Sequence, residues 1–227
     1  MRLTKVGYYA DFFVYPSMLL ILAVAALHDA PIVGWIKWAL AFLAGGAAWS
    51  LVEFLAHRFI LHHVPPFRRL HASHHADPRA LIGTPTWLSF AALGVVVFAP
   101  LWREAGFNLA SGFTAGLTLG YLWYVSVHHA VHRWRARRGS YLYRAKLRHA
   151  WHHGAGASCN FVVTTGWWDV VFGSDRMRAA PSDTRSGQSS VKARIRGGLG
   201  RANRRAVFDA ALKEATDTIN ADKRAAA

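Results

Sequence analysis

Cysteine and acidic residues are scarce in this sequence. Its 227 residues include one cysteine, Cys159, and 12 aspartates and glutamates, against 27 lysines and arginines. A lone cysteine excludes an internal disulfide framework and any zinc or iron–sulfur site built on several thiolates. The sequence also lacks an HExxH motif, in which a glutamate beside two ligating histidines acts as general base. Zinc hydrolases of that kind are therefore disfavoured.

Apolar residues and tryptophan are plentiful instead. The hydrophobic fraction is 53%, with 10 tryptophans, which is high for a soluble domain of this size. A helix needs about 20 apolar residues to cross a hydrocarbon core of about 30 Å. Four apolar runs are candidates, at 12–27, 32–56, 81–102 and 107–127. The first is short enough to be a half-inserted hairpin arm, whereas the other three are long enough to cross. We expect an all-α, multi-pass membrane protein with about four transmembrane helices in these runs.

The positions of lysine and arginine predict the orientation of these runs. The connection between the second and third runs carries Arg58, Arg68, Arg69 and Arg79, and the chain beyond the fourth run is strongly basic. The other two connections carry few basic residues, so the positive-inside bias places both termini in the cytoplasm. Residues 1–11 contain an acid, and no small-residue cleavage site follows the first run, so we expect no cleaved signal peptide. We expect an integral protein of a bacterial inner membrane.

The formal net charge of +15 is compatible with binding to nucleic acid or to an anionic membrane surface. Most of the excess lies after residue 130, beside the last apolar run, which favours the anionic leaflet and no nucleic-acid partner. We expect 175–227 to be a basic cytoplasmic tail, partly disordered, with a possible surface helix at 204–219, where apolar residues form one helical stripe.

Histidine is the most informative residue. Of 13 histidines, all but His28 lie in four tight groups within 57–63, 71–75, 128–132 and 149–153. Each half of the chain has two apolar runs, one histidine group at the inner end of a run, and another in the polar segment beyond. This layout predicts one shared centre on one side of the membrane.

The spacing within the groups predicts which side chains point together. Positions i, i+3 and i+4 share a helix face, so the three histidines of "HASHH" converge, as do those of "HAWHH". His128 and His132 also share a face. His57 and His62 are five residues apart, about 140° around an ideal helix. If both bind one centre, the helix must distort or end between them.

A bound metal explains the clustering. Cationic imidazoles would repel one another, whereas neutral imidazole is a common metal ligand. A single zinc takes about four ligands, so ten patterned histidines suit two ions with about five apiece. Imidazoles without thiolate suit zinc, copper, iron or nickel. His63 and His129 lie outside the pattern, and His28 is expected on the opposite side of the membrane.

Together with the closing "NFVVTTGWWDVVFG" (160–173), these groups resemble the fatty acid hydroxylase and sterol desaturase superfamily of membrane di-iron oxygenases. The resemblance covers about 45–174, between an N-terminal membrane segment (1–44) and the tail. It implies a membrane fold with a cytosolic helical cap that carries the histidines. It also implies two iron ions, with zinc possible in isolated protein, O2 as co-substrate, and hydroxylation of a C–H bond in a membrane lipid. The H-x3-H third group is more similar to fatty acid hydroxylases than to carotenoid hydroxylases, which favours an acyl chain. The implied ligands are His57, His62, His71, His74, His75, His128, His132, His149, His152 and His153.

Other activities remain open. A desaturase and a sterol, hopanoid or carotenoid oxygenase share this chemistry. A histidine-rich metal transporter is less favoured, because a transport pathway needs polar residues within the spans and the four runs have almost no ionisable groups. The chain lacks the haem-binding electron-carrier domain of the fused fungal and animal forms. The resemblance therefore implies a separate electron donor, a ferredoxin or a cytochrome-b-type protein with its reductase.

Ligating histidines usually donate their second N–H to a carboxylate or carbonyl, which fixes the ring. Three acids, which lie near a histidine group or in the closing segment, are candidates for accepting such an N–H. Glu53 is also compatible with an interfacial role, and Asp169 with a helix cap. Asn160 is a candidate for contacting a metal or orienting substrate. Two tryptophans are weak candidates for the substrate entrance, since tryptophan favours membrane interfaces whatever the function. The candidates are Glu53, Asp77, Asn160 and Asp169 around the metals, and Trp167 and Trp168 for substrate.

Overall fold

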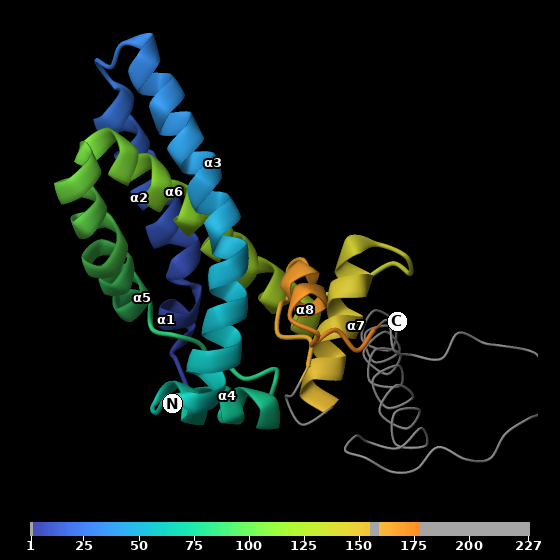
Figure 1. Ribbon diagram of the computed structural model, residues 1–227. Coiled ribbons are helices and arrows are strands. Elements are labelled where there is room, and N and C mark those ends of the chain that lie inside the picture. The colour runs from blue at the N-terminus through green and yellow to red at the C-terminus, as the bar shows by residue number, and fades with distance from the viewer. Residues whose placement is uncertain (1, 155–158, 178–227) are drawn as a thin grey trace, which may run out of the picture.

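The computed structural model describes residues 2–154 and 159–177, and the regular elements in this part of the chain are all helices (Figure 1). The predicted all-α class is confirmed. The predicted tail helix at 204–219 lies outside the described residues. The elements are α1 (Lys5–Tyr9), α2 (Asp11–Leu27), α3 (Ile32–Leu55), η1 (Ala56–Leu61), α4 (Phe67–Ala76), α5 (Thr86–Ala92), η2 (Leu93–Phe98), α6 (Ala99–Arg133), α7 (Tyr141–Gly154) and α8 (Trp167–Val171).

Three helical segments among the described residues are long and apolar enough to cross a membrane. They are Lys5–Leu27, Ile32–Leu61 and Thr86–Arg133. The third has 48 residues and contains the whole of the predicted run 107–127 and residues 86–102 of the run before it. Gly106 interrupts it with a φ of 82°, a left-handed value that favours glycine. Figure 1 shows the chain turning back between α5 and the later part of α6, so that these two parts form the arms of a hairpin.

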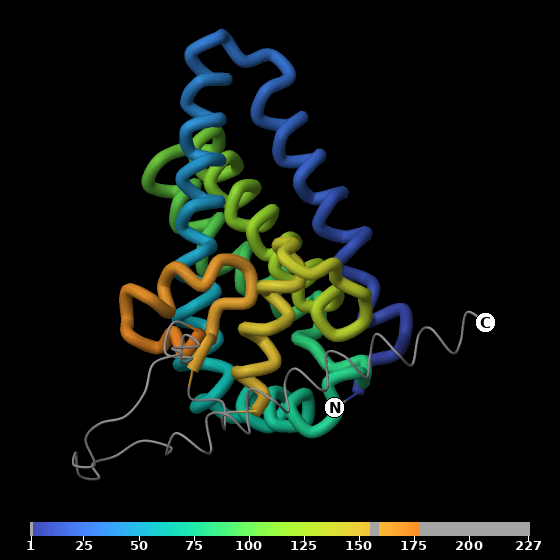
Figure 2. The backbone as a smooth tube through the Cα atoms, turned by 90° about the vertical axis from the view of Figure 1, so that its right-hand side faces the viewer, coloured from blue at the N-terminus to red at the C-terminus, as the bar shows by residue number. Residues whose placement is uncertain are grey.

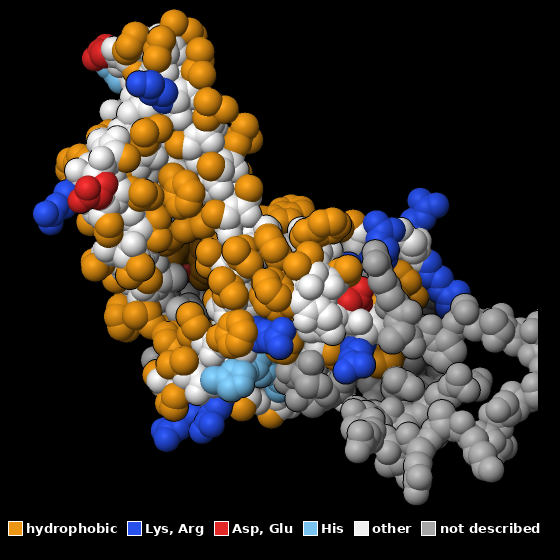
Figure 3. Space-filling view, in the orientation of Figure 1, with side chains coloured by type: hydrophobic (Ala, Val, Ile, Leu, Met, Phe, Trp, Pro, Cys, Tyr) orange, Lys and Arg blue, Asp and Glu red, His pale blue; other side chains and the backbone are white. Residues whose placement is uncertain are grey.

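The helices divide into a column and a cap (Figures 1 and 2). Helices α2, α3, α5 and α6 form the column, while α4, α7 and α8 gather at one end. Large apolar side chains such as Leu20, Ile21, Leu40 and Leu43 are 63–66% exposed on the column. Figure 3 shows hydrophobic side chains covering it, with histidine and basic side chains at the cap end. An apolar outer surface of this kind suits a hydrocarbon environment.

The central contact of the column, between α3 and α6, depends on glycine. A Cβ added at Gly116 would lie 2.9 Å from the amide nitrogen of Gly46 and still closer to the backbone carbonyl of Phe42. Small residues allow two membrane helices to approach this closely. The contact holds the histidine-bearing ends of η1 and α6 at one level.

Replacing Gly116 by alanine is therefore expected to lower stability by about 1–3 kcal/mol, since the added methyl group forces the two backbones apart. The measurement is the midpoint of thermal unfolding in detergent. Gly94→Ala is the matched control, because a Cβ there meets nothing within 4 Å. Equal losses in both variants would show that the α3–α6 contact is not the cause.

Candidate metal centre

The end of α3 departs from α-helical geometry where the sequence required a distortion. Residues Ala56–Leu61 form the π-helical segment η1. Hydrogen bonds from i to i+5 bring residues five apart onto one face, and such segments are frequent at functional sites. The rings of His57 and His62 stack with their centroids 5.3 Å apart and their planes 8° apart. The prediction that the helix distorts between them is confirmed.

Five histidines converge through their Nε2 atoms to form a first set. The Nε2 atom of His71 lies 3.0 Å from that of His57 and 3.1 Å from that of His62. The Nε2 atom of His75 lies 3.0 Å from that of His71 and 3.1 Å from that of His152. The set therefore draws on η1, the residue after it, α4 and α7. Residues from both halves of the chain meet here.

The second set joins α4, α6 and α7. The Nε2 atom of His149 lies 2.8 Å from that of His132 and 3.0 Å from that of His153. His74 belongs to the same compact group of possible ligand atoms. The ring of His128 lies 4.7 Å from that of His74 and 4.8 Å from that of His149, between centroids. The sets adjoin, because the rings of His75 and His153 stack at 4.1 Å.

These arrangements fit metal ions. Nitrogen ligands about 2.1 Å from one ion lie about 3.0 Å apart when octahedral and about 3.4 Å apart when tetrahedral, close to the 3.0–3.3 Å found in the first set. Some buried ring nitrogens have no hydrogen-bond partner among the described residues, notably both nitrogens of His74. A metal ion bound by the second set would take the Nε2 atom of His74 as a ligand. The donors are all imidazoles, which suit iron, zinc, copper or nickel.

The surroundings keep these rings neutral. Burial, followed by the charge of nearby imidazoles, lowers the pKa of His62 and of His74 to about 4. Burial lowers the pKa of His152 to about 3, and it lowers the pKa of His149 well below its ordinary value. Each is therefore unprotonated at pH 7 and has a lone pair available for a metal.

A backbone carbonyl fixes one of the rings. The Nδ1 atom of His152 lies 2.8 Å from the carbonyl oxygen of Cys159, which accepts its N–H and leaves Nε2 directed at the first set. Carbonyls commonly orient metal-binding histidines in this way. Sequence reasoning missed this partner, because every residue has a carbonyl and no side chain marks the one that is used.

Two of the candidate acids, Glu53 and Asp169, are buried and bind the closing segment, and none of the hydrogen bonds described for them reaches a histidine ring. Glu53 accepts hydrogen bonds from the amide of Val163 at 2.7 Å, the amide of Thr164 at 3.1 Å, and the Thr164 hydroxyl. Asp169 accepts from the amides of Phe161 and Val162, both at 2.8 Å. The acids thereby shape the segment that begins at Cys159. Their contribution to the histidines is indirect, because it passes through the carbonyl of Cys159, which accepts from His152.

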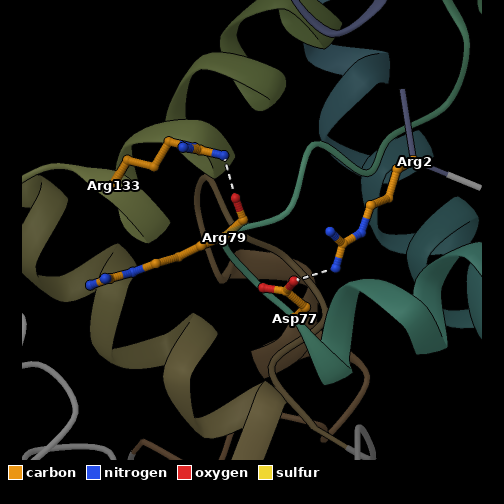
Figure 4. A network of polar contacts seen from close by, with 4 residues as sticks. All are labelled: Arg2, Asp77, Arg79 and Arg133. Atoms are coloured by element: carbon orange, nitrogen blue, oxygen red, sulfur yellow. Dashed lines mark hydrogen bonds and ion pairs between the residues drawn. The ribbon is translucent and has the colours of Figure 1, made fainter. Parts of the chain in front are cut away.

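Asp77 and Asn160 also have partners other than histidine. Asp77 forms an ion pair with Arg2 at 2.9 Å, which ties the chain start to the loop after α4 (Figure 4). In the same view, Arg133 donates to the carbonyl of Arg79. The side-chain oxygen of Asn160 accepts from the amide of Arg176 at 3.0 Å. Its side-chain nitrogen is buried without a partner among the described residues.

A cavity of about 190 Å³ lies beside the histidines. Histidines of both sets line it, together with apolar and tyrosine side chains from η1, α4 and α6. Trp167 and Trp168 do not line it. Trp167 is 64% exposed, and the indole N–H of Trp168 donates to the Ser50 hydroxyl at 3.0 Å. The histidines on the cavity wall are His57, His71, His74 and His128.

The two off-pattern histidines have other contacts. The Nδ1 atom of His63 lies 2.9 Å from the carbonyl oxygen of Arg58, and its side chain is exposed. The Nδ1 atom of His129 lies 3.1 Å from the Tyr8 hydroxyl. No hydrogen bond or ring contact described for either of them reaches a histidine of the two sets.

We expect His63→Ala and His129→Ala to retain bound metal within about twofold of wild type, because neither ring reaches the centre. Elemental analysis of the purified variants measures this. Loss of metal from His63→Ala but not from His62→Ala would show that the first set has the wrong register.

Comparison with known proteins identifies the family. The fatty acid hydroxylase family model matches residues 38–174, which include all four histidine groups and the closing segment. The chain belongs to the fatty acid hydroxylase family.

Relatives in the fatty acid hydroxylase family include fatty acid 2-hydroxylase of Rattus norvegicus, 32% identical over 143 residues, which are 58% of this chain and 38% of that one. Ceramide very long chain fatty acid hydroxylase of Schizosaccharomyces pombe is 28% identical over 165 residues, 67% of this chain and 46% of that one. This chain thus spans less than half the length of these relatives. The solved structure of scs7p, with its hydroxylase domain visible, has a TM-score of 0.64 at 23% identity over 75% of this chain and 67% of that one. That likeness shows the fold.

Proposed function

We propose that this member of the fatty acid hydroxylase family inserts one oxygen atom from O2 into a C–H bond of an acyl chain in a membrane lipid. Two iron ions, held by the first and second histidine sets, would serve as the cofactor. The observation that carries the proposal is the convergence of ten histidines into two adjoining sets of five beside a cavity at the end of the membrane column.

The chain supplies what such a reaction needs. When bound, the ions would supply the activation of O2. Imidazole suits this task because thiolates are readily oxidised. The cavity wall includes Leu61, Leu70 and Val125 beside the histidines, so it offers a hydrocarbon chain an apolar surface next to both sets. The closing segment holds His152 in place through the Cys159 carbonyl.

An acyl substrate is supported by the names of the relatives, which are fatty acid and ceramide hydroxylases. We assign the reaction to 45–174, with 1–44 as a membrane segment and 175–227 as a basic tail. The arginines of the cap favour the cytoplasmic side of a bacterial inner membrane, by the positive-inside bias. A separate ferredoxin or cytochrome-b-type protein with its reductase would deliver electrons there. No nucleic-acid partner is proposed.

Metal analysis and lipid mass spectrometry test this function together. We expect about two irons per purified chain and, in cells that contain the protein, an acyl lipid heavier by one oxygen atom. Zinc that exchanges readily, without O2 consumption in the presence of a reductant, would refute the oxygenase. Loss of two hydrogens would indicate a desaturase, and a change confined to carotenoids or hopanoids would refute the acyl substrate.

A further inference from the structure

A buried carboxylate lies on the cavity wall outside the part of the chain that the family model matches. Asp11 is the first residue of α2, whereas the match begins at residue 38. It is 7% exposed and lines the same cavity as His57 and His74. A carboxylate in a membrane segment is costly unless it is paired or used, so its position calls for a role.

The known partners of Asp11 are neutral and leave acceptor capacity. The Thr86 hydroxyl donates to Oδ1 at 2.6 Å, and the Tyr121 hydroxyl donates to Oδ2 at 2.8 Å. An ionised carboxylate has about four lone-pair sites, so about two remain. The two hydroxyls come from α5 and α6 and fix the carboxylate against rotation. A fixed acceptor with free lone pairs suits a donor from a ligand.

The rest of the wall points to a neutral ligand group. Among the described residues that line the cavity, Glu53 is a second carboxylate and none is lysine or arginine. Trp49 also lines it, and its indole N–H is buried without a hydrogen-bond partner in the described part of the chain. The Trp49 ring lies 5.3 Å from that of Tyr121, between centroids. The wall therefore offers an acceptor and a donor that both contact one tyrosine.

The depth of this pair matches the polar part of a lipid. Asp11 directly precedes the apolar run 12–27 and lies near the start of the candidate span Lys5–Leu27, so it is close to the level where hydrocarbon gives way to headgroups. Amide and hydroxyl groups of membrane lipids lie at this level, beside their acyl chains.

We propose that Asp11, with Trp49 beside it, selects the lipid by accepting a hydrogen bond from a neutral amide N–H or hydroxyl group and by repelling a free carboxylate. This rests on the proposed function, because it assigns the polar end of the lipid whose acyl chain reacts at the histidines. Asp11 is a specificity-determining residue and takes no part in the chemical step.

The test compares a dihydroceramide with the free fatty acid of the same acyl chain. We expect wild-type protein to favour the dihydroceramide. Asp11→Asn keeps the size of the side chain and one acceptor oxygen but removes the charge. It should lower kcat/KM for dihydroceramide roughly ten- to a hundredfold, the effect of losing one charge-assisted hydrogen bond, chiefly through KM. Turnover of the free acid should stay constant or rise.

Binding separates this proposal from the proposed function. Iron-loaded protein without O2 is heated with each lipid in turn, and the rise in unfolding temperature is compared. Wild-type protein should be stabilised more by dihydroceramide, and Asp11→Asn should lose that difference even if no product forms with either lipid. Equal stabilisation of wild-type protein by both lipids would overturn the role of Asp11.

Tyr15→Phe is the matched control. Its hydroxyl lies 2.6 Å from that of Ser89 in the same polar region, but Tyr15 does not line the cavity. This variant should keep the wild-type preference between the two lipids. If Asp11→Asn instead lowers metal content, stability and turnover of both lipids in parallel, Asp11 only ties α2 to its neighbours and the proposal fails.

Discussion

Replacing His152 by alanine is expected to abolish hydroxylation and empty the first histidine set, while the protein stays in the membrane. His152 is fully buried, and its Nε2 atom lies 3.1 Å from that of His75 and 3.3 Å from that of His62. Turnover should fall by more than about a hundredfold, since even groups that only orient a ligand are worth ten- to a hundredfold. His71→Ala should behave alike, because its Nε2 atom meets three others of the set.

Three measurements distinguish the loss of the metal site from a general loss of folding. Metal per chain should fall by about half if the second set keeps its ion. The yield of membrane-inserted protein should match wild type, because the apolar helices and not the metal drive insertion. His63→Ala, an exposed histidine of the same cap, should retain both metal and turnover. Wild-type turnover by His152→Ala would remove that residue from the site.

Much of the site follows from sequence because histidine spacing is tied to helix geometry. The i, i+3, i+4 pattern of "HASHH" places three rings on one side of α4, and the structure brings all three to the sets. The five-residue spacing of His57 and His62 required a distorted helix, and η1 provides it. Such inferences hold because local backbone geometry determines which side chains share a face.

The division of the rings between the sets does not follow from spacing. His74 and His75 are neighbours on α4, yet His75 meets the Nε2 atoms of the first set and His74 groups with the second. Which set each ring joins depends on how α4 docks between η1, α6 and α7, which is a tertiary property. The cavity role of Asp11 is hidden for the same reason, since its partners Thr86 and Tyr121 lie 75 and 110 residues away.

Glu53 is one of the sequence candidates for contacting a histidine, and its actual partners give the largest expected loss of stability. Its carboxylate is 2% exposed and accepts the amides of Val163 and Thr164 and the Thr164 hydroxyl. Glu53→Ala leaves these buried donors without an acceptor, and each costs about 1–3 kcal/mol. We expect a total loss of about 3–5 kcal/mol, measured by chemical unfolding in detergent.

The same change should weaken the metal centre through the backbone. The segment that Glu53 holds at Val163 begins at Cys159, whose carbonyl orients His152. Glu53→Ala should therefore lower metal affinity roughly ten- to a hundredfold, the usual effect of losing a group that orients a ligand. Glu53→Gln is the matched variant, because its amide oxygen can still accept both backbone N–H groups, and it should retain most of the stability and the metal. If Glu53→Ala loses stability but binds metal as wild type does, the closing segment does not transmit the position of Glu53 to His152.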